Sequence, residues 1–287
     1  MNTVDELLRD ARARLAAAPF APPTREAALL LGRVLGWSEA EVLARGERRV
    51  EETAAARFAE LLARRLGGEP VAYLFAEREF YGRAFHVDRR VLIPRPESEH
   101  LVEAALARLR RHRHKARRIL DVGTGSGCLA VTLALELPEA AVVATDLSPA
   151  ALAVAASNAR RHAVAGRVRL AACDLLAGLD AGAFDLAVSN PPYVGRGEAP
   201  ALSREVVDFE PAAALFADDE GEDAGIAAYS HLFAQAAALA PGAWLLVEIG
   251  HGQLAAVRRR AAASGLQVEG VVEDYAGIPR VVELRRP

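Results

Sequence analysis

Cysteine and lysine are both scarce in this sequence of 287 residues. The two cysteines, Cys128 and Cys173, are too few for a disulfide framework in a chain of this size, which favours a reducing compartment. We therefore expect a cytoplasmic protein. Lys115 is the only lysine, and arginine supplies the other basic side chains. Together with the abundance of alanine, this is typical of codon bias in a GC-rich genome and indicates no functional device.

A strong charge imbalance is absent as well. Lysine and arginine together number 35 and aspartate and glutamate 38, so the formal net charge is −3. A protein that coats nucleic acid needs a broad basic face, and this balance argues against that class. Apolar residues make up 52% of the chain, which excludes wholesale disorder. The acidic N-terminal segment lacks the basic and then apolar order of a signal peptide.

Residues 226–247 form an uncharged stretch that is long enough to span a bilayer. Three polar residues and a turn pair interrupt it: Ser230, His231, Gln235 and Pro241-Gly242. A buried helix followed by a buried strand accounts for this pattern better than a membrane span does. We therefore expect no membrane association.

Residues 1–75 are predicted to be helical. Two pairs have the spacing of a capping box, in which each side chain satisfies a backbone N–H at the helix start: Thr3 with Glu6, and Ser38 with Glu41. Gly67-Gly68 is a helix-stop signal. Because the region carries no nucleotide or metal motif, its role is recognition or packing, and of the two we expect a helical substrate-recognition domain.

Residues 76–96 change to strand-like spacing around Gly82-Arg83 and Asp88-Arg89, which predicts a linking β-hairpin. The apolar residues that recur are Phe80, Tyr81, Phe85, Val87, Val91 and Ile93. Pro94-Arg95-Pro96 closes the hairpin, and a new helix is expected from Glu97.

Residues 97–287 alternate short apolar runs with helical stretches. The runs are 119–120, 141–145, 168–172, 184–188 and 244–249. This alternation is typical of βαβ units and predicts an α/β domain around a mostly parallel, Rossmann-like sheet. Residues 266–273 and 280–284 predict a closing antiparallel pair of strands joined at Tyr275-Ala276-Gly277.

A glycine-rich turn, Asp-Val-Gly-Thr-Gly-Ser-Gly, occupies residues 121–127 between a predicted strand and a helix. Glycine permits positive φ and close backbone approach, so a ligand can lie against the main chain at the helix N-terminus. The spacing is G-x-G-x-G and not the G-x-G-x-x-G of the dinucleotide fingerprint, because the residue after Gly127 is Cys128. A purely structural tight turn is the alternative for this segment taken alone.

Asp146 ends the next predicted strand, where a carboxylate can accept both hydroxyl groups of a ribose. The alternative is that Asp146 or Ser148 is the N-cap of the helix that begins at Pro149-Ala150. Asp174 follows the strand after that and could receive an adenine amino group, although such a residue is more often a loop or cap residue. Turn, helix, strand and acid in this order favour a nucleoside ligand.

The segment Asn190-Pro191-Pro192-Tyr193 follows the fourth predicted strand, at the edge where open α/β sheets bind ligands. The two prolines fix φ and remove two N–H donors, which leaves carbonyl groups free to face a substrate. Asn190 adds a side-chain acceptor and Tyr193 a flat face. Such a site suits a planar NH2 group, whose two hydrogens meet two acceptors while its nitrogen faces the nucleoside ligand. A bland proline turn is the alternative.

The glycine turn, Asp146 and residues 190–193 resemble class I S-adenosylmethionine-dependent methyltransferases that act on amino or amide nitrogens. Four further segments resemble the HemK/PrmC family: Glu79-Phe80-Tyr81-Gly82, Leu92-Ile93-Pro94-Arg95-Pro96-Glu97, Asp208-Phe209-Glu210-Pro211 and Glu248-Ile249-Gly250-His251-Gly252-Gln253. The resemblance covers nearly the whole chain. It implies a small helical domain, a linking hairpin and a seven-stranded methyltransferase domain.

The same resemblance implies the activity. Members transfer a methyl group from S-adenosyl-L-methionine to the side-chain amide (N5) of the glutamine in the GGQ motif of class I peptide chain release factors, which modulates translation termination. S-adenosyl-L-homocysteine is the product. The cofactor-binding residues that the resemblance implies are Gly123, Thr124, Gly125, Ser126, Gly127, Asp146, Leu175 and Asn190. The catalytic and substrate-binding residues that it implies are Asn190, Pro191, Pro192 and Tyr193.

The sequence departs from the family pattern at three positions. Ala76 and Ala243 stand where glycine is common in relatives, and Ser98 stands where threonine is usual. We expect these departures to affect loop geometry and not the chemistry.

Three other functions remain open. The first is glutamine methylation of a ribosomal protein, which would use the same residues 190–193, and the N-terminal helices would decide between the two. The second is N6-adenine methylation of nucleic acid, against which stand the net charge and the lack of a basic recognition domain. The third is a non-catalytic cofactor-binding scaffold, which has no use for an intact amide-holding loop. We expect no sequence-specific nucleic-acid binding.

Residues 108–118 are strongly basic and contain His112 and His114. A solvated helix end is the simpler interpretation, and contact with an acidic partner or ribosomal RNA is the alternative. No metal site is expected, because no carboxylate or cysteine accompanies the histidines at ligand spacing. Cys128 and Cys173 are interpreted as small buried residues and not as nucleophiles, and His251 as a loop residue.

Overall fold

The computed structural model describes residues 2–18, 22–111, 117–217 and 225–287. They divide into two compact units. The helical unit comprises Met1–Ala76 with Arg204–Phe209, and the sheet unit comprises Glu77–Ser203 with Glu210–Pro287. The chain therefore leaves the sheet unit after Ser203 and returns to it at Glu210. No pattern in the sequence predicted this excursion.

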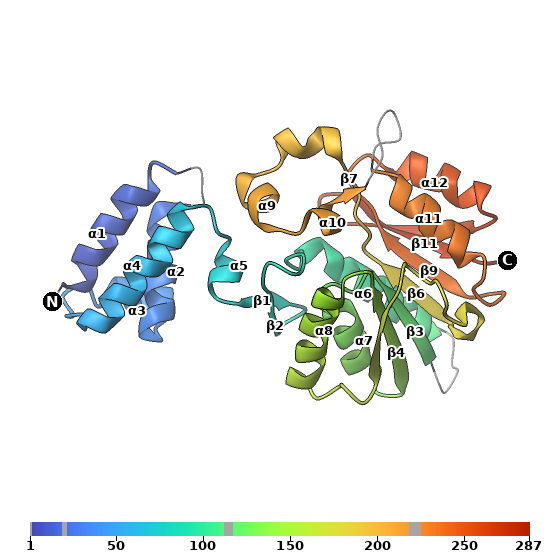
Figure 1. Ribbon diagram of the computed structural model, residues 1–287, viewed down its shortest axis with the longest axis horizontal. Helices are drawn as coiled ribbons and strands as arrows, with labels where there is room; N and C mark the ends of the chain where they lie inside the picture. The colour runs from blue at the N-terminus through green and yellow to red at the C-terminus, as the bar shows by residue number, and fades with distance from the viewer. Residues whose placement is uncertain (1, 19–21, 112–116, 218–224) are drawn as a thin grey trace. The chain divides into compact units, whose positions relative to one another are not determined.

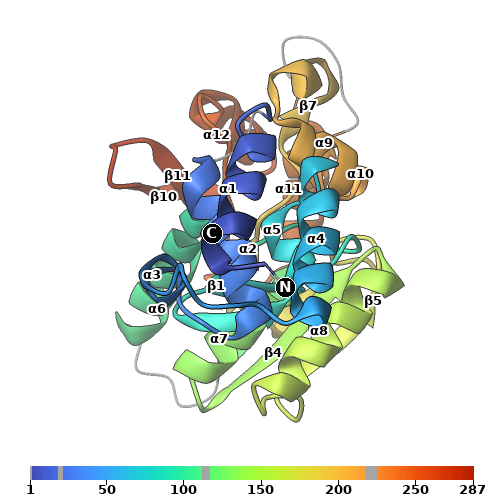
Figure 2. The same cartoon turned by 90° about the vertical axis from the view of Figure 1, so that its left-hand side faces the viewer.

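The helical unit packs its helices around a core of its own. Its elements are α1 (Val4–Leu15), α2 (Pro23–Leu35), α3 (Glu39–Ala44), α4 (Glu52–Leu66), α5 (Val71–Leu74) and α9 (Arg204–Phe209), and Figure 2 shows α1, α2 and α4 side by side. Leu8, Leu30 and Phe58 are among its buried residues. Both predicted capping boxes are present, at the starts of α1 and α3. Helix α4 ends before the predicted glycine stop, and Gly68 has a φ of +95°.

A buried arginine joins three helices of the helical unit. The side chain of Arg65 in α4 is 2% exposed. Its Nε and a terminal nitrogen donate to the two carboxylate oxygens of Glu26 in α2, at 2.9 and 3.1 Å. The guanidinium also pairs with Glu205 in α9. Since a buried charge is stable only when it is paired, Arg65 fixes α9 against α2 and α4.

The sheet unit is built on a seven-stranded sheet in the order β10-β11-β9-β6-β3-β4-β5. The strands are β3 (Arg117–Val122), β4 (Ala140–Asp146), β5 (Val168–Ala172), β6 (Leu186–Ser189), β9 (Trp244–Glu248), β10 (Gln267–Glu273) and β11 (Pro279–Arg285). Six of the seven run in one direction, and β11 runs opposite to them and pairs antiparallel with both β9 and β10. The predicted α/β fold with an antiparallel C-terminal pair is confirmed.

Helices cover both faces of this sheet (Figure 1). On one face lie α6 (Glu99–Arg111), α7 (Cys128–Glu136) and α8 (Pro149–Arg161), and on the other lie α11 (Ala227–Ala236) and α12 (Leu254–Ala263). Alternate residues of one strand point to opposite faces. In β3, Ile119 packs into the core under α6 and α7, and Leu120 into the core under α11 and α12.

The chain reverses its direction across the sheet at β3. It runs outward from β3 to β4 and β5, and then crosses over to β6 on the other side of β3. In register, Val122 at the end of β3 faces Thr145 of β4 on one side and Ser189 of β6 on the other. Ligands of open α/β sheets bind outside the carboxyl ends of the strands at such a reversal.

The linking hairpin is shorter than the sequence predicts. Strands β1 (Glu77–Phe80) and β2 (Arg83–His86) pair around Tyr81-Gly82. Val91 and Ile93 are buried but lie in no strand, so their alternation reflects packing and not pairing. A short 3-10 helix, Pro96–Ser98, precedes α6, so the α-helix starts at Glu99 and not at Glu97.

The remaining elements are short. They are the 3-10 helices Ala181–Ala183 and Arg196–Ala201, helix α10 (Ala212–Leu215), and the parallel pair β7 (Val194–Gly195) and β8 (Phe216–Ala217). Residues 226–247 form α11 and most of β9, as predicted. Among the described residues, none of the helices has both the length and the apolar character needed to cross a membrane.

Replacing Arg65 by alanine should destabilise the helical unit by about 3–5 kcal/mol, because the buried Glu26 carboxylate loses its partner. Urea unfolding monitored by circular dichroism measures this loss. Arg14→Ala is the matched control, since the side chains of Arg14 and its partner Asp10 are 45% and 66% exposed and their pairing should contribute less than about 1 kcal/mol. Equal effects of the two substitutions would contradict the assignment.

Candidate active site

The loop after β3 carries three glycines with left-handed backbone: Gly123 (φ +73°), Gly125 (φ +54°) and Gly127 (φ +80°). A Cβ at Gly127 would lie 3.0 Å from the Cβ and 3.1 Å from the Cα of Ala155 in α8, so only glycine lets the loop pack there. A Cβ at Gly125 would meet nothing within 4 Å. This part of the loop is therefore open to a ligand that approaches the backbone.

Asp121 in β3 is fully buried beneath this loop. Its Oδ2 accepts from the Thr124 hydroxyl at 2.6 Å and from the Ala130 N–H at 3.1 Å, which ties the loop to the start of α7. Its Oδ1 is buried without a hydrogen-bond partner among the described residues. Burial, opposed by these two hydrogen bonds, raises the pKa of Asp121 to about 7. The glycine-turn pattern included Asp121 but did not single it out.

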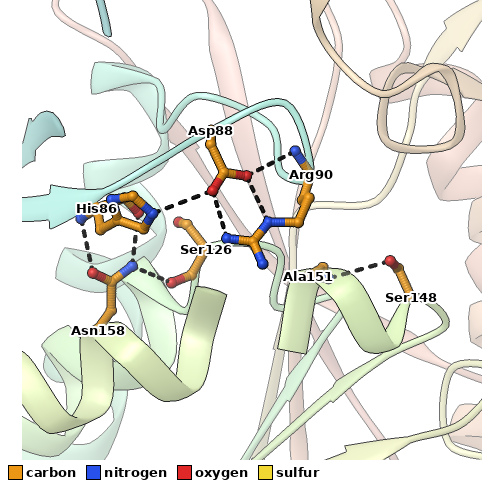
Figure 3. Close-up of polar contacts among 7 residues, drawn as sticks. All are labelled: His86, Asp88, Arg90, Ser126, Ser148, Ala151 and Asn158. Carbon is orange, nitrogen blue, oxygen red and sulfur yellow. Dashed lines mark hydrogen bonds and ion pairs between the residues drawn. The ribbon is translucent and has the colours of Figure 1, made fainter. Parts of the chain in front are cut away.

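Asp146 ends β4 and faces the same loop. Its Oδ2 accepts from the Gly125 N–H at 2.9 Å, and its Oδ1 accepts from the Ser148 N–H at 2.8 Å. The N-cap of α8 is Ser148, whose hydroxyl accepts from the Ala151 N–H at 3.2 Å (Figure 3). Asp146 is therefore not the cap. Each of its oxygens can accept a second hydrogen bond, which leaves capacity for a ligand.

Asn158 in α8 joins the glycine loop to the hairpin (Figure 3). It is fully buried, and its Nδ2 donates to the carbonyls of Ser126 and His86 at 2.8 and 2.9 Å. Its Oδ1 accepts from the His86 N–H at 2.8 Å. Next to it, Arg90 holds the pKa of the Asp88 carboxyl down to about 2. Asn158 thus fixes the position of Ser126, and sequence spacing gave no sign of it.

Two leucines lie along the edge formed by the ends of β4 and β5. Leu147, directly after Asp146, is 72% exposed, which is unusual for a large apolar side chain. Leu175 is half-buried with a φ of +54°, and its carbonyl accepts from the Thr145 hydroxyl at 3.0 Å. Asp174 is exposed. Of the two leucines, only Leu175 was predicted from the sequence, although the position of Leu147 directly after the acid could have indicated it.

Asn190 follows β6 and is held from behind by a polar chain. Its Nδ2 donates to the Ser98 hydroxyl at 3.0 Å, and that hydroxyl donates to Oε2 of Glu248 at 2.6 Å. Ser98 and Glu248 are buried. The Ser98 hydroxyl thus contacts Asn190 directly, and the threonine usual at this position carries the same hydroxyl, so the expectation that this departure leaves the chemistry unchanged stays a prediction. Ala76 is different: it has a φ of +51°, a conformation that favours the glycine common in relatives.

The rest of the segment is held from the end of β9. Pro191 is buried, and Pro192 and Tyr193 are half-buried. Gln253 donates its Nε2 to the Tyr193 carbonyl at 2.7 Å, and the Tyr193 hydroxyl lies 3.5 Å from Oε1 of Glu248. Burial raises the pKa of Tyr193, so it stays a neutral phenol.

The β3–β6 pairing brings the two predicted sets of residues together. Val122 and Ser189 are register partners, and the Ser189 hydroxyl donates to the Val122 carbonyl at 2.9 Å. The glycine loop begins one residue after Val122 and the segment 190–193 begins one residue after Ser189. Both therefore start at the same edge of the sheet.

The sequence brought two cysteines and three histidines into question, and the structure describes Cys128, Cys173 and His251 among them. Burial raises the pKa of Cys128 to about 12, and burial also raises that of Cys173, so both thiols stay protonated. His251 is exposed in the loop after β9. His112 and His114 lie outside the described residues. Within the described ranges, no three His, Cys, Asp or Glu side chains are arranged to hold a metal ion.

Comparison with known proteins covers both units. Residues 6–75 match the family model of the PrmC N-terminal domain, and residues 99–218 match the methyltransferase small domain. A release factor glutamine methyltransferase of Nitratidesulfovibrio vulgaris is 42% identical over 99% of this chain and 91% of its own. The chain belongs to the release factor glutamine methyltransferase family.

Further relatives agree with this family. The release factor glutamine methyltransferase of Koribacter versatilis is 41% identical over 99% of both chains. Among solved structures, the T. thermophilus 16S rRNA N2 G1207 methyltransferase, in complex with AdoMet and guanosine, has a TM-score of 0.50 and 21% identity. That match covers 74% of this chain and 50% of the other, and it shows the methyltransferase fold alone.

The buried Asp121 predicts a pH dependence of stability. Its pKa is about 7 in the folded protein and 3.8 ordinarily, so between about pH 4 and 7 the folded protein keeps a proton that the unfolded chain has released. Its contribution to stability therefore falls as the pH rises through that window. In Asp121→Asn the group no longer titrates. The stability of the variant relative to the wild type should rise by on the order of 4 kcal/mol from pH 4 to 7, and level off above.

Urea unfolding of both proteins across that range measures the difference. The buried Glu248 is present in both proteins, so its titration cancels. A difference that does not change with pH would contradict the burial of an uncompensated carboxyl at position 121.

Proposed function

We propose that this protein transfers a methyl group from S-adenosyl-L-methionine to the side-chain amide nitrogen of the glutamine in the GGQ motif of class I peptide chain release factors. S-adenosyl-L-homocysteine is the product. The observation that carries the proposal is the register of β3 with β6, which starts the glycine loop and Asn190 at one edge of the sheet. Family membership over almost the whole chain supports the acceptor.

The residues at this edge fit the cofactor. The open approach to Gly125 suits the methionine portion, and the buried Asp121 has an oxygen without a partner among the described residues that can accept from an ammonium group. Asp146 retains acceptor capacity for the ribose hydroxyls. The exposed Leu147 and the half-buried Leu175 offer apolar surface for the adenine. The cradle is completed by Gly123, Thr124, Ser126 and Gly127.

The segment 190–193 would hold the glutamine amide. The amide NH2 presents two N–H donors, and Asn190 Oδ1 and the Pro191 carbonyl are acceptors in a stiff backbone. Tyr193, a neutral phenol, would lie against the flat amide. The ring of Pro192 fixes its φ angle, which stiffens the backbone between Pro191 and Tyr193.

Positioning is the main catalytic contribution of these residues. A bound S-adenosylmethionine supplies an electrophilic methyl group on its sulfonium. The amide nitrogen is a weak nucleophile, because its lone pair is delocalised into its own carbonyl. Acceptors at both N–H groups orient the amide so that this lone pair points at the methyl group, and they stabilise the positive charge that develops on the nitrogen. The methylated nitrogen is then cationic and strongly acidic, and it releases one proton to water from an N–H hydrogen-bonded to Asn190 or Pro191, so no general base is required beforehand.

The helical unit supports release factors over the rival acceptors. Residues 6–75 match the PrmC N-terminal domain, which is the part of the chain expected to decide between a release factor and a ribosomal protein. Incubation with labelled S-adenosylmethionine and three acceptors, a class I release factor, ribosomal proteins and DNA, tests the choice. Label on the release factor is expected, and label on another acceptor alone would overturn it.

Asn190→Ala should lower methyl transfer by at least about 100-fold, because it removes an acceptor that positions the reacting amide. The variant should still fold and bind S-adenosylmethionine, as calorimetry can measure. Asn2→Ala makes the same chemical change at an exposed position and should retain wild-type turnover. Turnover near the wild-type rate in Asn190→Ala would disprove the role of this residue.

Leu147→Ala should weaken binding of the cofactor by roughly 5- to 30-fold, which corresponds to about 1–2 kcal/mol of lost apolar contact. Because the side chain is 72% exposed in the free protein, its stability should not change. Leu43→Ala, at an exposed leucine of the helical unit, is the control and should leave the dissociation constant unchanged. Equal constants for both variants would remove Leu147 from the adenine site.

A further inference from the structure

Three side chains from distant parts of the sheet unit form a continuous chain of hydrogen bonds. The chain ends at Asn190, the first residue of the segment 190–193 that is proposed to hold the substrate. Ser98 ends the 3-10 helix before α6, Glu248 is the last residue of β9, and Asn190 follows β6. The Asn190 Nδ2 lies 3.0 Å from the Ser98 Oγ, which lies 2.6 Å from the Glu248 Oε2. Ser98 is 3% exposed and Glu248 1%.

Donors and acceptors in this chain can be ordered in one way when Glu248 is ionised. A carboxylate only accepts hydrogen bonds, so the single proton of the Ser98 hydroxyl is committed to Glu248. The Ser98 oxygen can then only accept from Asn190, which must turn its NH2 group inward. Its Oδ1 is left facing away from Ser98, and no donor among the described residues meets that oxygen.

The location of Glu248 makes this arrangement costly. All five residues of β9 are buried, and the other four are Trp244, Leu245, Leu246 and Val247. An apolar residue at the end of this strand would avoid the cost of burying a carboxylate. A buried acid with one strong hydrogen bond thus lowers the stability of the fold, and residues that do so concentrate at functional sites.

We propose that Glu248 and Ser98 are positioning residues that set the polarity of the Asn190 amide, so that Oδ1 and not NH2 is presented to the substrate. This rests on the proposed function, in which Asn190 must accept a hydrogen bond from the NH2 group of glutamine. An inverted Asn190 amide would place two NH2 groups against each other and repel the substrate. Neither residue touches the reacting atoms.

The surroundings of Glu248 make this polarity sensitive to pH. The charged and titratable groups that face it are Glu97 beside Ser98, Arg280 of β11, Tyr193 of residues 190–193, Cys128 of α7 and Tyr229 of α11. Burial, reinforced by Glu97 and opposed by Ser98 and Arg280, raises the pKa of Glu248 to about 7. A protonated Glu248 can donate to Ser98, which frees the serine proton to point at Asn190 and favours the inverted amide. Turnover should therefore fall as the pH drops through about 7.

Two substitutions at Ser98 test this relay, by which we mean the hydrogen bonds that connect Glu248 through Ser98 to Asn190. Ser98→Ala should lower kcat about 10- to 100-fold with release factor as acceptor, while the S-adenosylmethionine dissociation constant and the unfolding midpoint change little. Ser98→Thr keeps the hydroxyl and should restore kcat to within about threefold of the wild type. Ser230→Ala, which removes a hydroxyl bonded within α11, should be as active as the wild type. An unchanged kcat in Ser98→Ala, or a threonine variant as slow as the alanine variant, would overturn the proposal.

Glu248→Gln separates positioning from a structural role. Glutamine can either accept from or donate to Ser98, and it does not titrate, so kcat should fall and its acidic limb near pH 7 should disappear. A variant that keeps the wild-type limb would contradict the relay. So would a variant in which kcat falls only in proportion to the fraction of folded protein.

A spectroscopic readout is independent of the acceptor. In 15N-labelled protein, the Asn190 NH2 signals, identified by their absence from Asn190→Ala, should show one proton protected from exchange by Ser98. Ser98→Ala should abolish this protection and Ser98→Thr should restore it; unchanged exchange in Ser98→Ala would refute the relay. A wild-type protein that shows the protected proton but does not label release factor would instead refute the proposed function and leave the relay supported.

Discussion

The parallel pairing of β3 with β6 is the constraint on which the rest of the sheet unit depends. Val122 and Ser189 are partners at the ends of these strands, and a side-chain hydrogen bond of 2.9 Å joins them. Because the chain crosses from one side of β3 to the other between β5 and β6, the loops that follow the two strands diverge from one edge. The glycine loop extends from one strand and Asn190 from the other. A shift of this pairing by one residue would turn every side chain of β6 to the opposite face.

Two buried acids lie close to the functional edge, and both oppose the stability of the fold. Asp121 and Glu248 sit in strands whose other central residues are apolar, and burial raises the pKa of each to about 7. The apolar cores on the two faces of the sheet must offset this cost. The two acids position neighbouring groups through hydrogen bonds: Asp121 fixes Thr124 and the start of α7, and Glu248 fixes Ser98.

The features that could be predicted from the sequence are local ones. The capping boxes of α1 and α3 depend on residues three positions apart, and the glycine turn and residues 190–193 are contiguous. Their meeting at one edge follows from the strand order typical of α/β sheets. The resemblance to a known family added the identity of the ligands, which spacing alone left as a nucleoside and a planar NH2 group.

What could not be predicted depends on distant partners. Ser98 and Glu248 are 150 positions apart, and no pattern in either neighbourhood announces their hydrogen bond. The placement of α9 in the helical unit depends on Arg65 and Glu205, which are 140 positions apart. The alternation through Val91 and Ile93 misled the hairpin prediction, because both residues are buried by packing without a partner strand. The central claim, that this site presents acceptors to an amide NH2 group, is tested most directly by mass spectrometry of a release factor after reaction. The account predicts one methyl group on the side-chain nitrogen of the GGQ glutamine, and a methyl group on any other residue would contradict it.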